Sequence, residues 1–288
     1  MTEIQRQKIT RFLFYFWIYT LIVILWGAWV RISHSGNGCG NHWPLCEGSF
    51  IPNAANSKTW VEYAHRLMSG TYGLLVVFLF IYLRKLNLGK TFEIARKALL
   101  FLMISEALIG ALLVKGQLVT ANDSVTRLVV MSFHQLNSFL LTGVTYLIYL
   151  MVKAEKSESL SIKNRKVIIF FLLLPLTGAA ASLSTTLFPT TSLWQGISDD
   201  FSLGNHLFIR LRILHPVFAL LIAFSITYAL YLKNQMRLAA EFLFAIFIGI
   251  ITLLTLSPLS LKLAHLLIAH LLWARLLQFV SFPDSSKR

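Results

Sequence analysis

The sequence predicts an all-α polytopic membrane protein whose eight transmembrane helices form two pseudo-symmetric four-helix bundles. Of its 288 residues, 56% are hydrophobic and only 13% are charged, whereas a soluble domain has about 25% charged residues. The mean hydropathy is +0.68. The apolar residues fall into eight stretches, and each is close to the length of about 20 residues that crosses a bilayer. These observations exclude an ordinary water-soluble protein.

The eight apolar stretches are expected to be helices, because backbone groups in hydrocarbon must be satisfied within the segment. The alternating ten-residue segments of a membrane β-barrel are absent from the sequence. The first stretch follows a basic start but has no small-residue cleavage site, so we interpret it as a retained helix rather than a signal peptide. The expected spans are 12–32, 65–83, 97–115, 127–151, 167–187, 208–232, 239–257 and 260–280.

The distribution of Lys and Arg predicts the orientation. The chain carries 26 basic and 12 acidic residues, a formal net charge of +14. With the N-terminus inside, the basic loops 84–97 and 153–166 face the cytoplasm, so the positive-inside rule places both termini there. We therefore expect a multi-pass protein of the cell (inner, cytoplasmic) membrane whose basic loops meet anionic lipid. No basic block is interleaved with aromatic residues, which argues against a nucleic-acid partner.

The spans divide into two sets of four. We expect an N-terminal half at 1–152, a cytoplasmic linker at 153–166 and a C-terminal half at 167–288. Because four spans return the chain to its starting side, the two halves would be related by an axis along the membrane normal.

Four histidines occur at one depth in alternate spans. His65, His134, His215 and His265 lie in the second, fourth, sixth and eighth spans. Each is about two to seven residues from the expected start of its span, which is roughly 3–11 Å below the outer boundary. A single intramembrane histidine is often a packing residue, but packing gives no reason for alternate helices and a shared depth.

One pair of imidazoles in each half favours haem ligation, because haem iron takes axial ligands on both faces and helix bundles build such sites from facing side chains. A zinc or di-iron site would need more carboxylates or thiolates than the spans offer. His270 points about 140° away from His265, so we expect His265 to be the ligand. The arginines near the outer helix ends would contact haem propionates or extend to the interface: Arg66, Arg127, Arg210 and Arg212.

Both cysteines lie in the first outer loop, at about 33–62. Six residues separate Cys39 from Cys46, and an outer loop is an oxidising location, so we expect a disulfide. The disulfide would either staple the loop or act as a redox-active pair that passes electrons. A third interpretation is a zinc site formed by the two cysteines and His42.

Two carboxylates lie near the histidines. Glu62 precedes His65 by three residues on the same helical face. It either complements the positive end of the helix dipole or places an ionisable oxygen beside a haem. Glu106 lies inside the third span, where a charged acid is costly, so we expect it to be protonated or paired.

These residues belong to short motifs. Each motif alone is a weak signal, but their order along the chain is specific. In this order, on eight spans, the sequence resembles the haem A synthases of the CtaA/Cox15 family over essentially the whole chain. The motifs are Gly27-Ala28-Trp29-Val30-Arg31, Trp43-Pro44-Leu45-Cys46, Glu62-Tyr63-Ala64-His65-Arg66, Phe133-His134-Gln135, Leu214-His215-Pro216 and Ala264-His265-Leu266.

The resemblance implies an oxidoreductase that converts haem O to haem A for terminal oxidases. The C8 methyl group would be hydroxylated successively to give a formyl group. By position, His65 and His134 would ligate or face the substrate haem O, and His215 and His265 would be the axial iron ligands of a haem b cofactor. Glu62 would correspond to the catalytic carboxylate of the family.

The resemblance also implies partners and shows departures. Cys39 and Cys46 match an outer-loop pair that passes electrons or reductant, so the partners would be a haem O synthase and an electron acceptor or thiol reductant; a homo-oligomer stays open. A second cysteine pair of some relatives is missing from 188–207. Glu106 stands where an amide is more usual, and His270 where a small or acidic residue is expected.

Two other functions fit parts of the sequence. A bis-histidine cytochrome b-type protein that carries electrons would explain both histidine pairs, but neither Glu62 nor the cysteine loop. A transporter whose histidines relay protons would fit the parallel repeat, but the sequence lacks broken helices at corresponding midplane positions.

Overall fold

The computed structural model describes residues 2–53, 56–154 and 165–281. Within these ranges the regular structure is helical, apart from one isolated bridge between Cys46 and Ser49. Eight helical segments of the described chain are long and apolar enough to cross a membrane. The prediction of an all-α protein with eight membrane-spanning helices is therefore confirmed.

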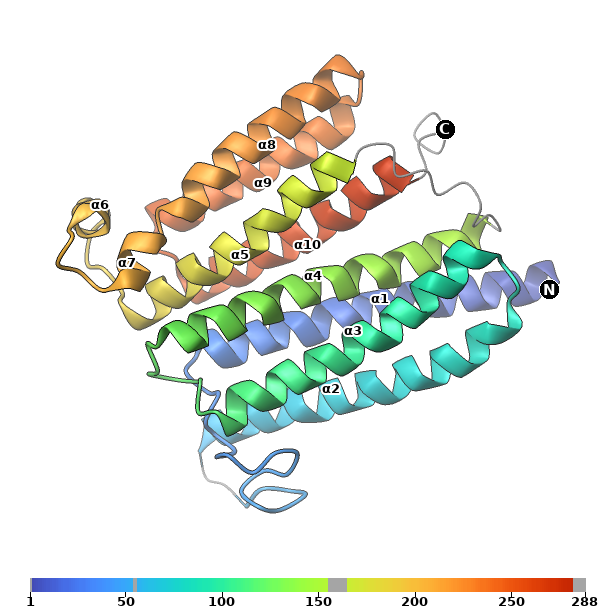
Figure 1. The fold of residues 1–288 in the computed structure, drawn as a ribbon, viewed down its shortest axis with the longest axis horizontal. Helices are drawn as coiled ribbons and strands as arrows, with labels where there is room; N and C mark the ends of the chain where they lie inside the picture. The colour runs from blue at the N-terminus through green and yellow to red at the C-terminus, as the bar shows by residue number, and fades with distance from the viewer. Residues whose placement is uncertain (1, 54–55, 155–164, 282–288) are drawn as a thin grey trace.

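The helices form two groups that lie side by side (Figure 1). Helix α4 lies between them and contacts α1 and α3 on one side and α5 and α10 on the other. The first group is α1 (Glu3–Ile32), α2 (Ser57–Tyr82), the short η1 (Leu83–Lys85), α3 (Lys90–Lys115) and α4 (Val125–Ala154). The second is α5 (Arg165–Leu187), α6 (Leu193–Phe201), α7 (Leu207–Leu211), α8 (Leu214–Leu232), α9 (Met236–Leu254) and α10 (Leu259–Ser281).

The first two helices begin earlier than hydropathy predicts. Helix α1 begins at Glu3 because the Thr2 side chain accepts from Gln5 N while Gln5 accepts from Thr2 N, a capping box. Helix α2 begins at Ser57, where the Asn56 side chain accepts from Lys58 N. Hydropathy finds the part of a helix that crosses hydrocarbon, and these polar turns extend the helix beyond it.

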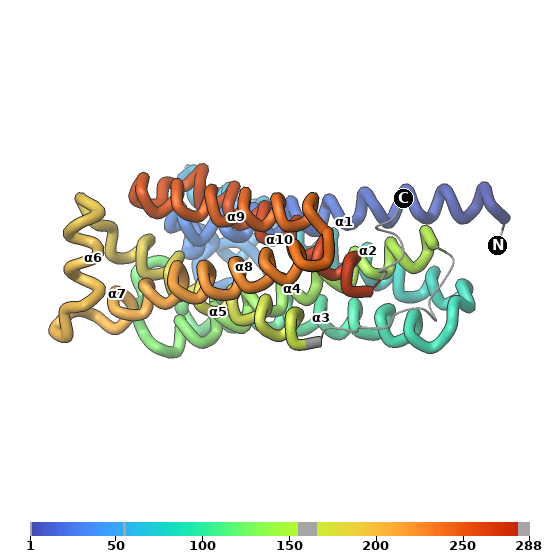
Figure 2. The backbone as a smooth tube through the Cα atoms, turned by 90° about the horizontal axis from the view of Figure 1, so that it is seen from above, coloured from blue at the N-terminus to red at the C-terminus, as the bar shows by residue number. Residues whose placement is uncertain are grey.

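The second group has two features that hydropathy does not predict. The sixth span is divided into α7 and α8, with a break at 212–213. The outer loop contains the extra helix α6, which stands out at one end of the molecule beyond the long helices (Figure 2). Its Trp194 side chain is 80% exposed and Phe201 is 72% exposed, so α6 presents apolar side chains outside the bundle.

Tight packing is concentrated in the inner parts of the long helices. In α10, every buried residue lies from His270 onward, whereas residues 259–269 are exposed or half-buried. The buried cluster of the first group likewise gathers around Leu13, Leu79 and Met151, far along the chain from the outer loops. In α10 the less tightly packed part therefore includes His265.

One close contact between the two groups joins α4 and α10. The Trp273 indole donates to Phe139 O at 2.8 Å, and a Cβ added to Gly143 would lie only 2.6 Å from Trp273 Nε1. Glycine at this position allows the indole to lie on the α4 backbone and to reach its acceptor.

The Gly143 contact is testable. Gly143→Ala should destabilise the protein by about 1–3 kcal/mol, because an extra methyl group in a filled contact forces the indole to move. Thermal unfolding of the purified protein in detergent measures the loss. Gly70→Ala is the matched control, since a Cβ at Gly70 would meet nothing within 4 Å. Equal melting temperatures for the two variants would contradict this account.

Candidate functional site

The four histidines lie at similar positions in their spans. Counted from the first residue of the observed spans at Ser57, Val125, Leu207 and Leu259, they are residues nine, ten, nine and seven. These positions replace the expected two to seven residues, because the observed spans begin earlier. The count from Leu207 crosses the break at 212–213, so it gives a position in the chain and not a depth.

His215 of α8 and His265 of α10 face each other. Their ring centres are 6.1 Å apart and their planes cross at 74°. An imidazole nitrogen binds a metal at about 2.0–2.1 Å and lies about 1.1 Å from its ring centre, so two imidazoles on opposite faces of one iron have ring centres roughly 6.3 Å apart. The observed pair therefore fits the axial ligands of a haem.

A neighbouring hydroxyl selects the tautomer of His215. The Nδ1 atom of His215 lies 3.1 Å from Thr177 Oγ1, and the Thr177 hydroxyl itself donates to Leu174 O. The hydroxyl oxygen is thus left to accept from Nδ1–H, which leaves the lone pair of His215 on Nε2. A hydrogen bond at the remote nitrogen is the usual way a protein orients a metal-ligating histidine.

His270 does not join this pair. Its side chain is 1% exposed and stacks on Phe139 with ring centres 3.9 Å apart. Both of its ring nitrogens are buried without a hydrogen-bond partner. His265, rather than His270, is the residue of α10 that faces His215.

Each of the four imidazoles lies against a glycine of the preceding span. A Cβ added to that glycine would lie 2.8–3.9 Å from the Cε1 atom of the ring, closest at His65. Sequence reasoning missed these contacts, although a glycine in each odd-numbered span was visible. The pairs are Gly27 with His65, Gly110 with His134, Gly178 with His215 and Gly249 with His265.

The first group brings together His65, His134 and Glu106. Both imidazoles have a buried Nδ1 without a hydrogen-bond partner. The Glu106 carboxylate lies 3.4 Å from His134 Nδ1 and accepts from the Asn137 amide at 2.6 Å. Asn137 also donates to Leu102 O at 2.9 Å, so the amide holds the carboxylate on the side of His134.

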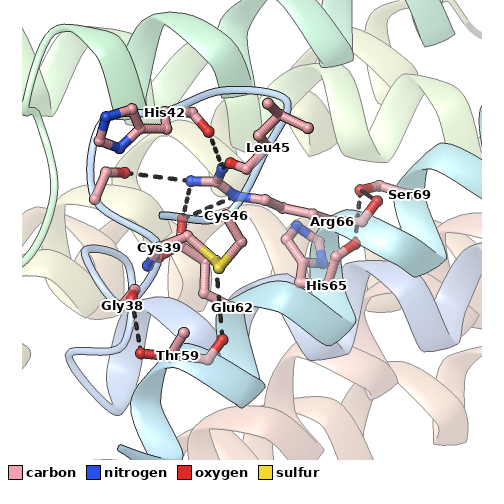
Figure 3. Close-up of polar contacts among 11 residues, drawn as sticks. Gly38, Cys39, His42, Leu45, Cys46, Thr59, Glu62, His65, Arg66 and Ser69 are labelled. Carbon is pink, nitrogen blue, oxygen red and sulfur yellow. Dashed lines mark hydrogen bonds and ion pairs between the residues drawn. A yellow bond between two sulfur atoms is a disulfide. The ribbon is translucent and has the colours of Figure 1, made fainter. Parts of the chain in front are cut away.

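Glu62 is held between α2 and the outer loop (Figure 3). Its side chain is 3% exposed. One carboxylate oxygen accepts from the Cys39 amide at 2.8 Å, and the other accepts from Arg66 at 2.5 and 3.1 Å. The carboxylate is an acceptor in all three contacts, one helical turn from His65. The sequence indicated its place beside His65 but not these partners.

Arg66 fastens the outer loop to α2. Besides Glu62, its guanidinium donates to the carbonyl oxygens of His42, Leu45 and Gly40 (Figure 3). Three loop contacts on one side chain explain why a segment with little regular structure keeps a defined shape over the helix end. Arg66 contacts protein groups here, whereas the sequence suggested a propionate.

Cys39 and Cys46 form a disulfide, as expected from their spacing. The two residues are 0% and 1% exposed. With both thiols bonded to each other, the zinc interpretation with His42 loses its thiolate ligands. No group of three His, Cys, Asp or Glu side chains that could hold a metal ion occurs among the described residues. Two imidazoles still suffice for haem, because the porphyrin supplies the other ligands.

The remaining outer arginines differ in their partners. Arg127 donates to Thr120 O at 2.6 Å and to Asn122 O at 2.5 Å. Arg212 forms an ion pair with Asp200 and donates to Gly196 O; burial raises the pKa of Asp200 even though the ion pair opposes that shift. Arg127 and Arg210 each keep a buried Nε atom without a hydrogen-bond partner.

Comparison with known proteins gives a family match and two kinds of relative. The family model COX15-CtaA, described as Cytochrome oxidase assembly protein, matches residues 10–277. A Protoheme IX farnesyltransferase of Thermus thermophilus is 32% identical over 229 residues, 76% of this chain and 37% of that protein. A Heme A synthase of Bacillus cereus is 43% identical over 93 residues, 32% of this chain and 30% of that protein. The chain thus matches 30–37% of the length of these curated relatives.

The buried disulfide should resist reduction. We expect a membrane-impermeant phosphine to cleave it slowly in the native protein. Arg66→Met should speed cleavage at least about tenfold, because each lost charge-assisted hydrogen bond contributes about 1.5–3 kcal/mol. Timed reduction followed by thiol alkylation and mass spectrometry measures the rate, with the exposed Lys58→Met as control. Cleavage of the native protein as fast as of the unfolded chain would instead favour the redox-active interpretation.

Proposed function

The chain belongs to the COX15-CtaA family of cytochrome oxidase assembly proteins, and we propose that it is a haem A synthase. In this proposal it oxidises the C8 methyl group of haem O to a formyl group, with haem b as cofactor. The observation that carries the proposal is the pair of imidazoles of His215 and His265, whose ring centres are 6.1 Å apart. The likeness to the Heme A synthases of Bacillus supports the same activity.

The second half would hold haem b. His215 and His265 are spaced for the two faces of one porphyrin, and Thr177 directs the Nε2 lone pair of His215 toward that position. Gly178 and Gly249 give the two rings room to stand against the helix backbones. Both imidazole rings would thus be ordered before the haem binds. Less conformational entropy would then be lost on binding, which favours tight binding.

The first half would hold haem O between His65 and His134. When bound, the iron porphyrins supply the redox chemistry that takes electrons from an unactivated methyl group, which a side chain cannot do. Glu106 would orient His134 through Nδ1 and leave Nε2 for the iron, while Asn137 keeps the carboxylate in place. A carboxylate behind an imidazole also raises the basicity of the ligand.

Glu62 would act on the substrate edge. Its oxygens accept from Arg66 and from the Cys39 amide, so the carboxylate is fixed before substrate arrives. A fixed acceptor near the methyl group would stabilise developing positive charge or orient the water that traps it. The disulfide loop would serve this step by supplying the Cys39 amide and by covering the carboxylate from bulk water.

One feature favours the synthase over a bis-histidine cytochrome. The residue three positions before each histidine is Glu62, Met131, Arg212 or Lys262 in turn. At this position a carboxylate precedes only His65, and the other carboxylate described beside a histidine, Glu106, lies against His134 of the same half. A pure electron carrier would use both haems alike. The match to the Thermus Protoheme IX farnesyltransferase covers 37% of that protein, so its name does not decide the activity of this segment.

The setting follows from the spans. The eight apolar helices and the family support a multi-pass membrane protein, and we propose the cell membrane with both termini in the cytoplasm. The four histidines would then lie near the outer face. A haem O synthase and an electron acceptor or thiol reductant are the partners this reaction requires.

The role of Glu62 can be separated from its structural contacts. Glu62→Gln keeps the size of the side chain, so haem content should be retained while haem A formation falls roughly 10²–10³-fold, the usual cost of one preorganised electrostatic group. Co-expression with a haem O source and chromatography of extracted porphyrins gives both quantities. Glu47→Gln, an exposed acid of the same loop, is the control. Unchanged turnover in Glu62→Gln would remove Glu62 from the mechanism.

The cofactor ligands are tested by absorption spectroscopy. His215→Ala and His265→Ala should each lose the low-spin b-type spectrum of the purified protein, because one axial ligand is gone. His270→Leu is the control, since that ring stacks on Phe139 and does not face His215. A complete low-spin spectrum in either alanine variant would refute the assignment of these two ligands.

A further inference from the structure

Two cations from different halves converge on one face of α5. Arg31, near the outer end of α1, donates to the Ser182 hydroxyl at 3.0 Å. Lys262, in the first turn of α10, donates to the Thr186 hydroxyl at 3.2 Å. Ser182 and Thr186 are one helical turn apart, and the Thr186 hydroxyl donates to Ser182 O at 2.7 Å. The two positive charges therefore meet at the junction of α1, α5 and α10.

The pair has positive charge without a counterion in the protein. Among the described residues, no carboxylate lies within ion-pair distance of Arg31 or Lys262. The Arg31 Nε atom is buried without a hydrogen-bond partner. Two like charges near the edge of hydrocarbon are costly unless an anion joins them. The other outer arginine on α2, Arg66, has Glu62.

The cations stand one or two helical turns outward from the imidazoles. On α1, Arg31 follows Gly27, the glycine against His65, by one turn. On α10, Lys262 precedes His265 by three residues. On α5, Gly178 lies against His215, and Ser182 and Thr186 follow it at successive turns. One turn is about 5.4 Å, so the cations lie beside the outer edges of porphyrins held by these histidines.

We propose that Arg31 and Lys262 form one anion-binding site that takes propionate carboxylates of the porphyrins in the two halves. The inference rests on the proposed function, because the carboxylates belong to haems ligated by the four histidines. Arg31 serves the His65 side, since it follows Gly27 by one turn on α1, and Lys262 serves the His265 side. The hydroxyls of Ser182 and Thr186 hold the two cations in place until the carboxylates arrive.

This placement differs from the one the motifs suggested. Arg66, Arg127 and Arg212 donate hydrogen bonds to loop carbonyl oxygens or to carboxylates of the protein. Arg31 and Lys262 contact only neutral hydroxyls in the contacts described above, which leaves guanidinium and ammonium protons for an external anion. Because the two cations belong to different halves, filling the site would also draw α1 and α10 together on α5.

The test compares protohaem with its neutral dimethyl ester. The full chain is produced under haem limitation, placed in detergent and titrated with each compound while the Soret absorption is followed. The unsubstituted protein should bind the free acid at least about tenfold more tightly than the ester, because charge-assisted hydrogen bonds are lost with the ester. Arg31→Gln and Lys262→Met should each reduce that preference severalfold. Arg31→Lys and Lys262→Arg, which keep the charge, should retain it.

The controls separate this site from general effects. Lys115→Met removes an exposed cation at the outer end of α3 and should leave the preference unchanged. Wild-type preference in both Arg31→Gln and Lys262→Met overturns the inference while leaving the proposed function intact. Co-purified phospholipid is measured by mass spectrometry in the same variants. A variant that loses this phospholipid but still prefers the free acid over the ester also overturns the inference, since the cations then bind a lipid phosphate. Failure of the unsubstituted protein to bind either porphyrin overturns the proposed function and this site with it.

Discussion

The close approach of an imidazole to a glycine backbone on the preceding span is the contact on which the rest of the structure depends. It occurs in each of the four helical pairs that carry a histidine. A methyl group in place of the glycine hydrogen at position 27 would lie 2.8 Å from the His65 ring. At positions 178 and 249 the added Cβ would lie 3.2 and 3.1 Å from the ring, so a side chain there would force the ring or the helix to move, whereas the 3.9 Å at Gly110 is an ordinary contact.

The outer loop depends on a second constraint, the triangle of Glu62, Arg66 and the Cys39 amide. The disulfide shortens the loop, but Arg66 attaches it to α2 through loop carbonyls. The carboxylate proposed to be catalytic therefore also contributes to the attachment of the loop to α2.

The spans and the positions of the histidines within them were predictable, because both depend only on the order of residues along the chain. Hydropathy located the eight spans, and His65, His134, His215 and His265 lie in alternate spans as the sequence shows. The sequence could not give the contacts between helices, such as Gly249 against His265 or Arg31 with Ser182, because these depend on rotation and register. Polar caps such as Asn56 extend helices past their apolar part, which is why the span starts were misplaced. Helix α6 is amphipathic and short, so a search for apolar stretches passes over it.

The central claim is that His215 and His265 both bind the iron of one porphyrin. Their rings would keep the orientation that they have in the protein without haem. Electron paramagnetic resonance of the oxidised purified protein tests it most directly, because the signal of a low-spin ferric haem depends on the angle between its two imidazole planes. The observed angle of 74° predicts the strongly anisotropic low-spin signal of crossed imidazoles. A solely high-spin signal, or a protein without haem, would contradict the account.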